Sequence, residues 1–140
     1  MISSKTKIRV RYEETDKMGI VYHAKYFVWF EVARIELLDQ IRCSYKQLEY
    51  EGYHLPVLEA QANFFRPANF DDLVTVSVEF STSSRLKMEM NYKVNRGEEL
   101  LATGRTIHAF VSREGKPIRP PENLARSIEK FSRRYISQTN

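Results

Sequence analysis

An acidic loop precedes the longest apolar helix that the sequence predicts, and it holds the strongest candidate for chemistry. The loop runs from Tyr12 to Gly19, and within it Asp16 lies seven residues before His23. Gly19 permits a tight turn or the close approach of a ligand. A loop of this length brings the Asp16 carboxylate back to the start of the helix, which we expect near His23.

The start of a helix is suited to hold a polarised or negatively charged oxygen. Its first N–H groups lack partners within the helix and lie at the positive end of the helix dipole. They polarise a carbonyl or stabilise an oxyanion. A carboxylate opposite such a carbonyl acts as a nucleophile, or as a base that activates water. Acidic residues are also common near helix starts for structural reasons, so a solvated acidic loop or an N-cap network is the alternative for Asp16.

The histidines and the single cysteine are weaker candidates for chemistry than Asp16. His23 is placed to donate a hydrogen bond to a substrate carbonyl or to orient water, and otherwise is a partly exposed residue at a helix start. His54 and His108 have no metal-ligand spacing with it, and we expect His108 to lie in the core or in an interface. Cys43 has no neighbouring histidine in the sequence and is predicted to be a buried structural thiol. The chain contains no HExxH, GxSxG or P-loop motif.

The positive charge of the chain raises the question of an anionic ligand. The formal net charge is +4. Without a dense Lys/Arg run or zinc-finger spacing, we do not expect nucleic-acid binding. Arg85 and Lys87 flank the start of a predicted strand, where they are candidates to contact ligand phosphates or are ordinary solvated charges. A mildly basic surface without a partner is the alternative for the charge as a whole.

The patterns along the chain predict the elements that position these residues. Alternation over residues 5–12 indicates a half-buried strand, and residues 23–41 have helical spacing with apolar side chains on most sides. A capping-box pattern from Ser44 to Gln47, with Gly52 as a stop, predicts a short second helix. Residues 58–64, 74–80, 86–94 and 100–111 are predicted strands, the last covered on both faces. An amphipathic helix follows Pro120 and Pro121.

Strands joined by short turns pair antiparallel. We therefore predict an α+β fold in one domain over residues 1–140, with a curved five-stranded antiparallel sheet and one face covering the long helix. The opposite face is polar enough for solvent or a partner subunit. No apolar run approaches the roughly 20 residues that span a bilayer, and the N-terminus lacks the apolar stretch of a signal peptide. One cysteine fits a reducing compartment, so we expect a cytoplasmic protein.

The loop and the helix start resemble the signature of a known family, the hotdog-fold acyl-CoA thioesterases of the 4-hydroxybenzoyl-CoA thioesterase type. The subgroup is the one that includes the Tol-Pal-associated thioesterases. The residues that carry the resemblance are Tyr12, Thr15, Asp16, the segment Gly19–His23, and Tyr26, followed by Phe30, Glu31, Ala33, Arg34, Pro56, Val57, Phe65, Pro67, Ala68, Phe70, Asp71 and Asp72, and then by Gly115, Lys116, Pro117 and Pro120.

The resemblance implies a role for each candidate residue. It implies that Asp16 is catalytic and that the backbone N–H of His23 is the oxyanion donor, with the His23 side chain as a second contributor. Tyr22 is expected beside the reacting thioester. The family's site lies between two subunits, so a homodimer or homotetramer is expected, with Arg85 and Lys87 as candidates to meet the CoA phosphates. No metal or organic cofactor is expected.

The function that the resemblance implies is the hydrolysis of an acyl-CoA, with a short-chain aliphatic or aromatic acyl group, to the free acid and CoA. Lys17 and Met18 stand where relatives often have smaller residues, which leaves the acyl group open. One alternative is a hydratase or dehydratase on the same fold, which requires an acid–base pair at the carbons beside the carbonyl. Another is a non-catalytic module that binds acyl carriers, because a fold does not guarantee activity.

Overall fold

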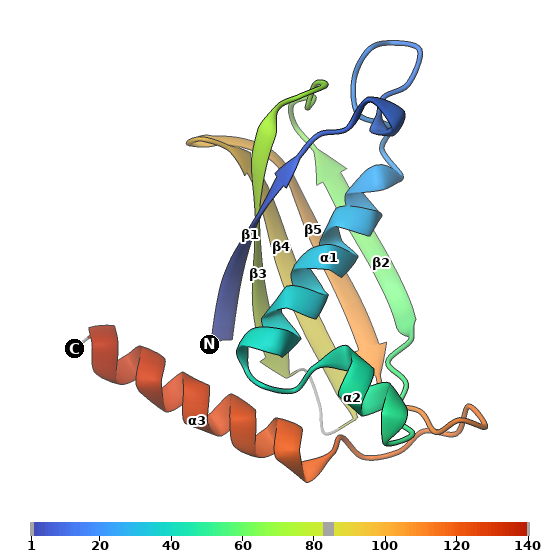
Figure 1. Ribbon diagram of the computed structural model, residues 1–140, viewed down its shortest axis with the longest axis vertical. Coiled ribbons are helices and arrows are strands. Elements are labelled where there is room, and N and C mark those ends of the chain that lie inside the picture. Colours follow the sequence, from blue (N-terminus) through green and yellow to red (C-terminus); the bar gives the residue numbers. More distant parts are fainter. Residues whose placement is uncertain (1, 83–85, 140) are drawn as a thin grey trace.

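The structure is a computed structural model that describes residues 2–82 and 86–139, and it consists of one curved sheet that wraps a long helix (Figure 1). This confirms the predicted α+β architecture. The strands are β1 (Ile2–Arg9), β2 (Val57–Phe64), β3 (Leu73–Thr82), β4 (Lys87–Arg96) and β5 (Glu99–Ala109). The helical elements are the 3-10 turn η1 (Tyr12–Glu14) and the helices α1 (Lys25–Gln40), α2 (Tyr45–Tyr50) and α3 (Glu122–Thr139).

The order of strands in the sheet is β1-β3-β4-β5-β2, and every neighbouring pair is antiparallel. Because β2 follows the helices and pairs with β5, the chain crosses from one edge of the sheet to the other. Helix α1 lies across the inner face between these edges (Figure 1). This crossing brings the end of β2 close to the start of α1.

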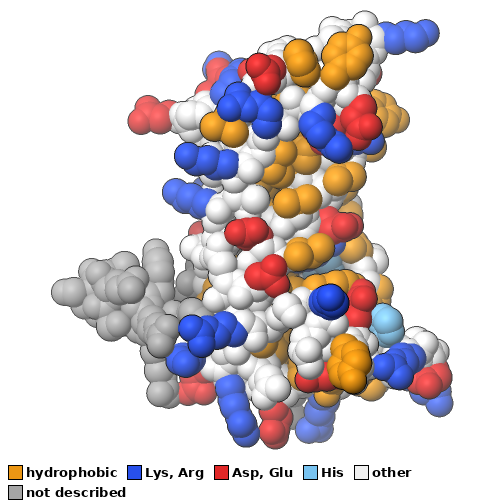
Figure 2. Space-filling view, in the orientation of Figure 1, with side chains coloured by type: hydrophobic (Ala, Val, Ile, Leu, Met, Phe, Trp, Pro, Cys, Tyr) orange, Lys and Arg blue, Asp and Glu red, His pale blue; other side chains and the backbone are white. Residues whose placement is uncertain are grey.

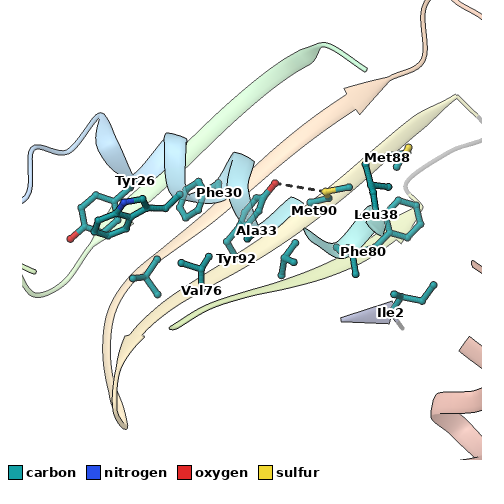
Figure 3. Close-up of a cluster of buried hydrophobic side chains, with 14 of the residues drawn as sticks. Ile2, Tyr26, Phe30, Ala33, Leu38, Val76, Phe80, Met88, Met90 and Tyr92 are labelled. Atoms are coloured by element: carbon teal, nitrogen blue, oxygen red, sulfur yellow. Dashed lines mark hydrogen bonds between the residues drawn. The ribbon is translucent and has the colours of Figure 1, made fainter. Parts of the chain in front are cut away.

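The core lies between α1 and the inner faces of β3, β4 and β5 (Figure 3). The ring of Phe30 stacks on that of Tyr92, with centroids 4.4 Å apart. It also lies directly on Gly104, where an added Cβ would come within 2.3 Å of the ring. Burial of side chains of this size stabilises the fold by roughly 1.5–3 kcal/mol each. The absence of a side chain at Gly104 therefore leaves room for the Phe30 ring against β5.

The boundaries at the N-terminal side differ from the prediction. The first strand ends at Arg9, and Tyr12, expected on its buried face, lies in η1 and is 77% exposed. The pairing continues for one more residue, where the Val10 N–H donates to the Asp72 carbonyl, 2.9 Å away, and the chain then turns into η1. Helix α1 begins at Lys25, two residues after the predicted start.

Strands β5 and β2, which are neighbours at one edge of the sheet, differ in how far their side chains are buried. In β5 the neighbours Ile107 and His108, which point to opposite faces, are both buried, as predicted. In β2 the residues expected on the inner face remain accessible, with Leu58 49% and Phe64 46% exposed. Strand β2 is therefore an edge strand whose apolar side chains lack cover within one chain.

The other two helical predictions are confirmed. Ser44 caps α2 by accepting a hydrogen bond from the Gln47 N–H at 3.2 Å. Helix α3 lies at the end of the molecule opposite the start of α1 (Figure 1). Among the described residues, no helix is both long enough and apolar enough to cross a membrane.

Candidate active site

The loop between η1 and α1 folds back on itself as the sequence predicts. Thr15 and Val21 form an antiparallel bridge, and the N–H of Asp16 donates to the Ile20 carbonyl at 2.9 Å. The N–H of Gly19 closes the turn on the Asp16 carbonyl at 3.0 Å. Gly19 has a φ of +82°, which glycine adopts without the penalty that a side chain brings. The turn thus fixes the position of Asp16.

The carboxylate of Asp16 is half-buried and only partly engaged. Its Oδ1 accepts a hydrogen bond from the Met18 N–H at 2.8 Å. Within the described part of the chain, the structure shows no hydrogen bond to the other carboxylate oxygen. One oxygen therefore holds the turn while the other stays available.

The start of α1 leaves two backbone donors unused. The N–H groups of Lys25 and Tyr26 donate to the carbonyls of Tyr22 and His23, at 2.9 and 3.2 Å. For the N–H groups of His23 and Ala24, the described residues supply no partner, and no side chain caps the helix. Both residues are exposed. Although the helix begins later than predicted, an unpaired amide lies at His23.

A pocket of about 370 Å³ joins these two features. Asp16 and His23 both line it, and Ile20, Phe64 and Phe65 supply apolar walls. Its size is in the range of small-molecule sites, which combine apolar walls with a few polar groups. The arrangement is suited to hold an apolar ligand whose polarisable oxygen meets the helix start, with a carboxylate nearby.

The other predicted site residues are placed less directly. Tyr22 is 46% exposed and is absent from the described lining of the pocket, but its ring lies 4.5 Å from that of His23. Lys87 is the first residue of β4, whereas Arg96 at the other end of this strand donates to the Pro67 carbonyl beside the pocket. Ten strand residues span about 30 Å, so Lys87 is far from Asp16 within one chain. Arg85 lies outside the described residues.

Ion pairs that the sequence did not predict hold the segment after β2, which forms one wall of the pocket. Arg66 lines the pocket and pairs with Glu99 at 2.8 Å. Arg96 pairs with Asp72 at 2.6 Å and also contacts Glu99. Burial raises the pKa of Asp72, but the Asn69 N–H and Arg96 outweigh it, so this pKa lies below its usual value. The only signal for this wall in the sequence is the resemblance from Phe65 to Asp72.

Glu14 is a second residue whose place was not predicted. It belongs to the acidic loop, yet it is 2% exposed. Its carboxylate accepts hydrogen bonds from the Trp29 indole N–H and the Arg11 backbone N–H. Glu14 thus caps η1 through the Arg11 N–H and is also bonded to α1 through Trp29.

The predicted burial of His108 and Cys43 is confirmed. His108 is fully buried, and its Nε2 lies 2.7 Å from the Thr106 hydroxyl, which in turn lies 2.7 Å from the Tyr92 hydroxyl. Cys43 is buried, with its Sγ 3.3 Å from the Ser127 hydroxyl. In the part of the chain that the structure describes, no group of three His, Cys, Asp or Glu side chains is placed to hold a metal ion.

Solved structures and curated proteins resemble this chain over most of its length. The DHNA-CoA thioesterase of Staphylococcus aureus superposes with a TM-score of 0.89 at 32% identity, covering 99% of this chain and 96% of that one. YneP of Bacillus subtilis (strain 168) is 35% identical over 117 residues, 82% of this chain and 85% of that protein. The acyl-CoA thioester hydrolase YbgC of Escherichia coli O6:H1 is 31% identical over 102 residues, 73% and 67% of the two chains.

The family model agrees with these similarities. The model described as the thioesterase-like superfamily matches residues 10–128, which include the loop, α1 and the whole pocket. The structural neighbours share the sheet wrapped around a central helix that the resemblance implied. The chain therefore belongs to the thioesterase-like superfamily, a family of thioester hydrolases with the hotdog fold.

Proposed function

We propose that this chain hydrolyses acyl-CoA thioesters in the pocket lined by Asp16 and His23. The observation that carries the proposal is that one pocket contains both a carboxylate and an uncapped helix start. The names of two relatives, an acyl-CoA thioester hydrolase and a DHNA-CoA thioesterase, support the choice of a CoA thioester as the substrate.

In the proposed reaction, the thioester carbonyl oxygen accepts a hydrogen bond from the His23 N–H. One such donor lowers the barrier by roughly 3–4 kcal/mol because it meets the charge that develops on the oxygen. Asp16 then attacks the carbonyl carbon or removes a proton from an attacking water. If Asp16 attacks, the carbon–sulfur bond breaks to leave an anhydride between Asp16 and the acyl group, and water then hydrolyses this anhydride. If Asp16 acts as a base, water adds directly to the carbonyl carbon before the carbon–sulfur bond breaks. In both cases one proton of the water ends on the CoA sulfur, so CoA leaves as its thiol and the acyl group leaves as a carboxylic acid.

The walls of the pocket favour a short aliphatic or an aromatic acyl group. Phe64 and Phe65 present aromatic surface, and Ile20 adds an aliphatic contact. Met18 lines the same pocket and is 76% exposed, so its flexible side chain adapts to the ligand. Met18→Ala is expected to shift the preference toward larger acyl groups without abolishing turnover.

We propose further that the working enzyme is a homo-oligomer, a dimer or a tetramer. Apolar side chains gather over α1 and β2 (Figure 2), among them Val28, Val32, Leu58 and Phe64. A long edge strand with exposed apolar residues is a surface on which another strand pairs. A second copy also supports the proposed role of Lys87 and Arg85 at the CoA phosphates, since Lys87 lies far from Asp16 in its own chain. We place the oligomer in the cytoplasm, which cell fractionation checks.

The test is a panel of short, long and aromatic acyl-CoAs in which the release of free thiol is measured. Wild-type protein is expected to release thiol from part of the panel, Asp16→Asn to lose this activity, and Lys17→Ala to retain it as the matched change in the same loop. His23→Ala keeps the backbone N–H and is expected to retain more activity than Asp16→Asn. Wild-type release that Asp16→Asn leaves unchanged would contradict the mechanism. Water addition to an enoyl-CoA without thiol release would instead indicate a hydratase, and tight binding without any turnover a binding module.

A further inference from the structure

Glu14 connects the two halves of the candidate site. Its Oε2 accepts a hydrogen bond from the Trp29 indole N–H at 2.7 Å, in the second turn of α1. Its Oε1 accepts from the Arg11 backbone N–H at 2.8 Å, where the chain leaves β1. Its own carbonyl accepts from the Tyr22 N–H at 2.8 Å, one residue before His23.

These contacts bracket the residues of the proposed reaction. Asp16 follows Glu14 by two residues, on one side of the turn that Thr15 and Val21 close. The unpaired amide of His23 follows directly after Tyr22, which Glu14 holds from the other side. Glu14 is thus bonded to both arms of the loop and to the helix behind it.

The environment of the Glu14 carboxylate makes its position rigid. The residue is 2% exposed and Trp29 is 1% exposed. A buried carboxylate left without one of its donors must shift or recruit water, because an unpaired buried charge is costly. The ring of Trp29 also lies 4.8 Å from that of Tyr26, which lines the pocket. A loss of the Glu14–Trp29 bond would therefore move Asp16 relative to the helix start.

We propose that Glu14, through its bond to Trp29, is a positioning residue that sets the placement of Asp16 opposite the unpaired amide at His23. This inference rests on the proposed thioester hydrolysis. Glu14 does not line the pocket in the described residues, so it acts through the loop and not on the substrate. Small displacements of reacting groups lower turnover strongly, because catalysis depends on their mutual geometry.

Two substitutions remove or weaken the bond. Trp29→Phe removes the indole N–H and keeps an aromatic ring, and Glu14→Gln keeps the length of the side chain but offers one acceptor to two donors. For each variant we expect kcat to fall about 10- to 100-fold with KM within about threefold, since neither replaced residue is among the described residues that line the pocket. The double variant is expected to be no more than about threefold worse than the poorer single variant, because both changes act on the same contact between Glu14 and Trp29.

The matched control is Leu37→Ala, in the same helix. Leu37 is 1% exposed and lies eight residues after Trp29, about 12 Å along the helix axis. Its loss leaves a core cavity and lowers the melting temperature, but kcat is expected to stay within about twofold of wild type. Melting temperatures are measured by circular dichroism, and kinetics are run below all of them.

Two results would overturn the proposal. One is a kcat of Trp29→Phe and Glu14→Gln within twofold of wild type, while Asp16→Asn is inactive. The other concerns Leu37→Ala at the same drop in melting temperature as Trp29→Phe and Glu14→Gln. If its kcat fell by as much as theirs, the loss would reflect a general effect of stability. Full activity in Asp16→Asn is a different result, since it contradicts the proposed function itself.

Discussion

The backbone N–H of Met18 donates to Oδ1 of Asp16 at 2.8 Å, so the side chain of the proposed reaction also closes the turn that holds it. An asparagine supplies the same carbonyl acceptor without the negative charge. Replacing Asp16 by Asn therefore separates the chemistry of the carboxylate from its structural role. Replacement by alanine removes both.

We predict that Asp16→Asn lowers kcat/KM by about 10³-fold or more, because it removes the nucleophile or base. The free energy of unfolding is expected to stay within about 0.5 kcal/mol of wild type, because the bond to Met18 persists. Thiol-release kinetics and urea denaturation measure the two effects. Asp16→Ala, which cannot bond to Met18, is expected to be inactive and also less stable. A parallel loss of stability in Asp16→Asn would contradict the separation.

The architecture was predictable because its signals are periodic and local. The helical spacing of residues 23–41 and the alternation in the four later segments predicted α1 and strands β2 to β5. The start of α1 was misplaced by two residues because Tyr22 bonds to the Glu14 carbonyl, a contact that periodicity does not report. Tyr12 was misplaced because the alternation of the sequence continues past Arg9, whereas the chain turns into η1 after Val10.

The candidate site was predictable only where its parts are close in the sequence. Asp16 and His23 are seven residues apart, and one turn brings both to the same pocket. Arg66 reaches that pocket because β2 crosses to the far edge of the sheet, which no local pattern indicates. Glu14 has the sequence context of an exposed loop, and its donor Trp29 lies fifteen residues later. Non-local contacts of this kind require the fold.

The contact of Phe30 with Gly104 leads to a prediction about stability. In Gly104→Ala the new Cβ would lie 2.3 and 2.4 Å from two atoms of the Phe30 ring, so the ring or the strand must move. Overpacking of this kind costs about 1–3 kcal/mol in the free energy of unfolding, which urea denaturation measures. Phe30→Leu makes room at the same place. The double variant is therefore expected to be more stable than the sum of the single effects, and strict additivity would contradict this account.

His108 predicts how stability depends on pH. Burial, and then the charge of Arg34, lowers the pKa of His108 to about 4 from an ordinary value of 6.5. Between these values the unfolded chain binds a proton that the folded chain does not, so stability is complete above about pH 6.5 and falls as the pH drops toward 4. The full loss is about 3 kcal/mol. Denaturation of wild type and His108→Gln between pH 7 and 5 tests this, and equal pH slopes in both would contradict it.

The proposed assembly predicts that two inactive variants restore activity when their subunits mix. If the site takes Asp16 from one chain and Lys87 from the other, a mixed dimer of Asp16→Asn with an Arg85→Ala/Lys87→Ala chain has one intact site and one that carries both defects. Random pairing of equal amounts makes half of the dimers mixed, so about a quarter of wild-type activity is expected at low substrate, where CoA binding limits the rate. Co-expression with two affinity tags isolates the mixed dimer, and each variant alone is the control. Light scattering measures its mass. A mixed dimer no more active than the average of its two parents would show that each chain binds the CoA phosphates with its own residues. Arg66, which lines the pocket together with Asp16, would then be the next residue to replace.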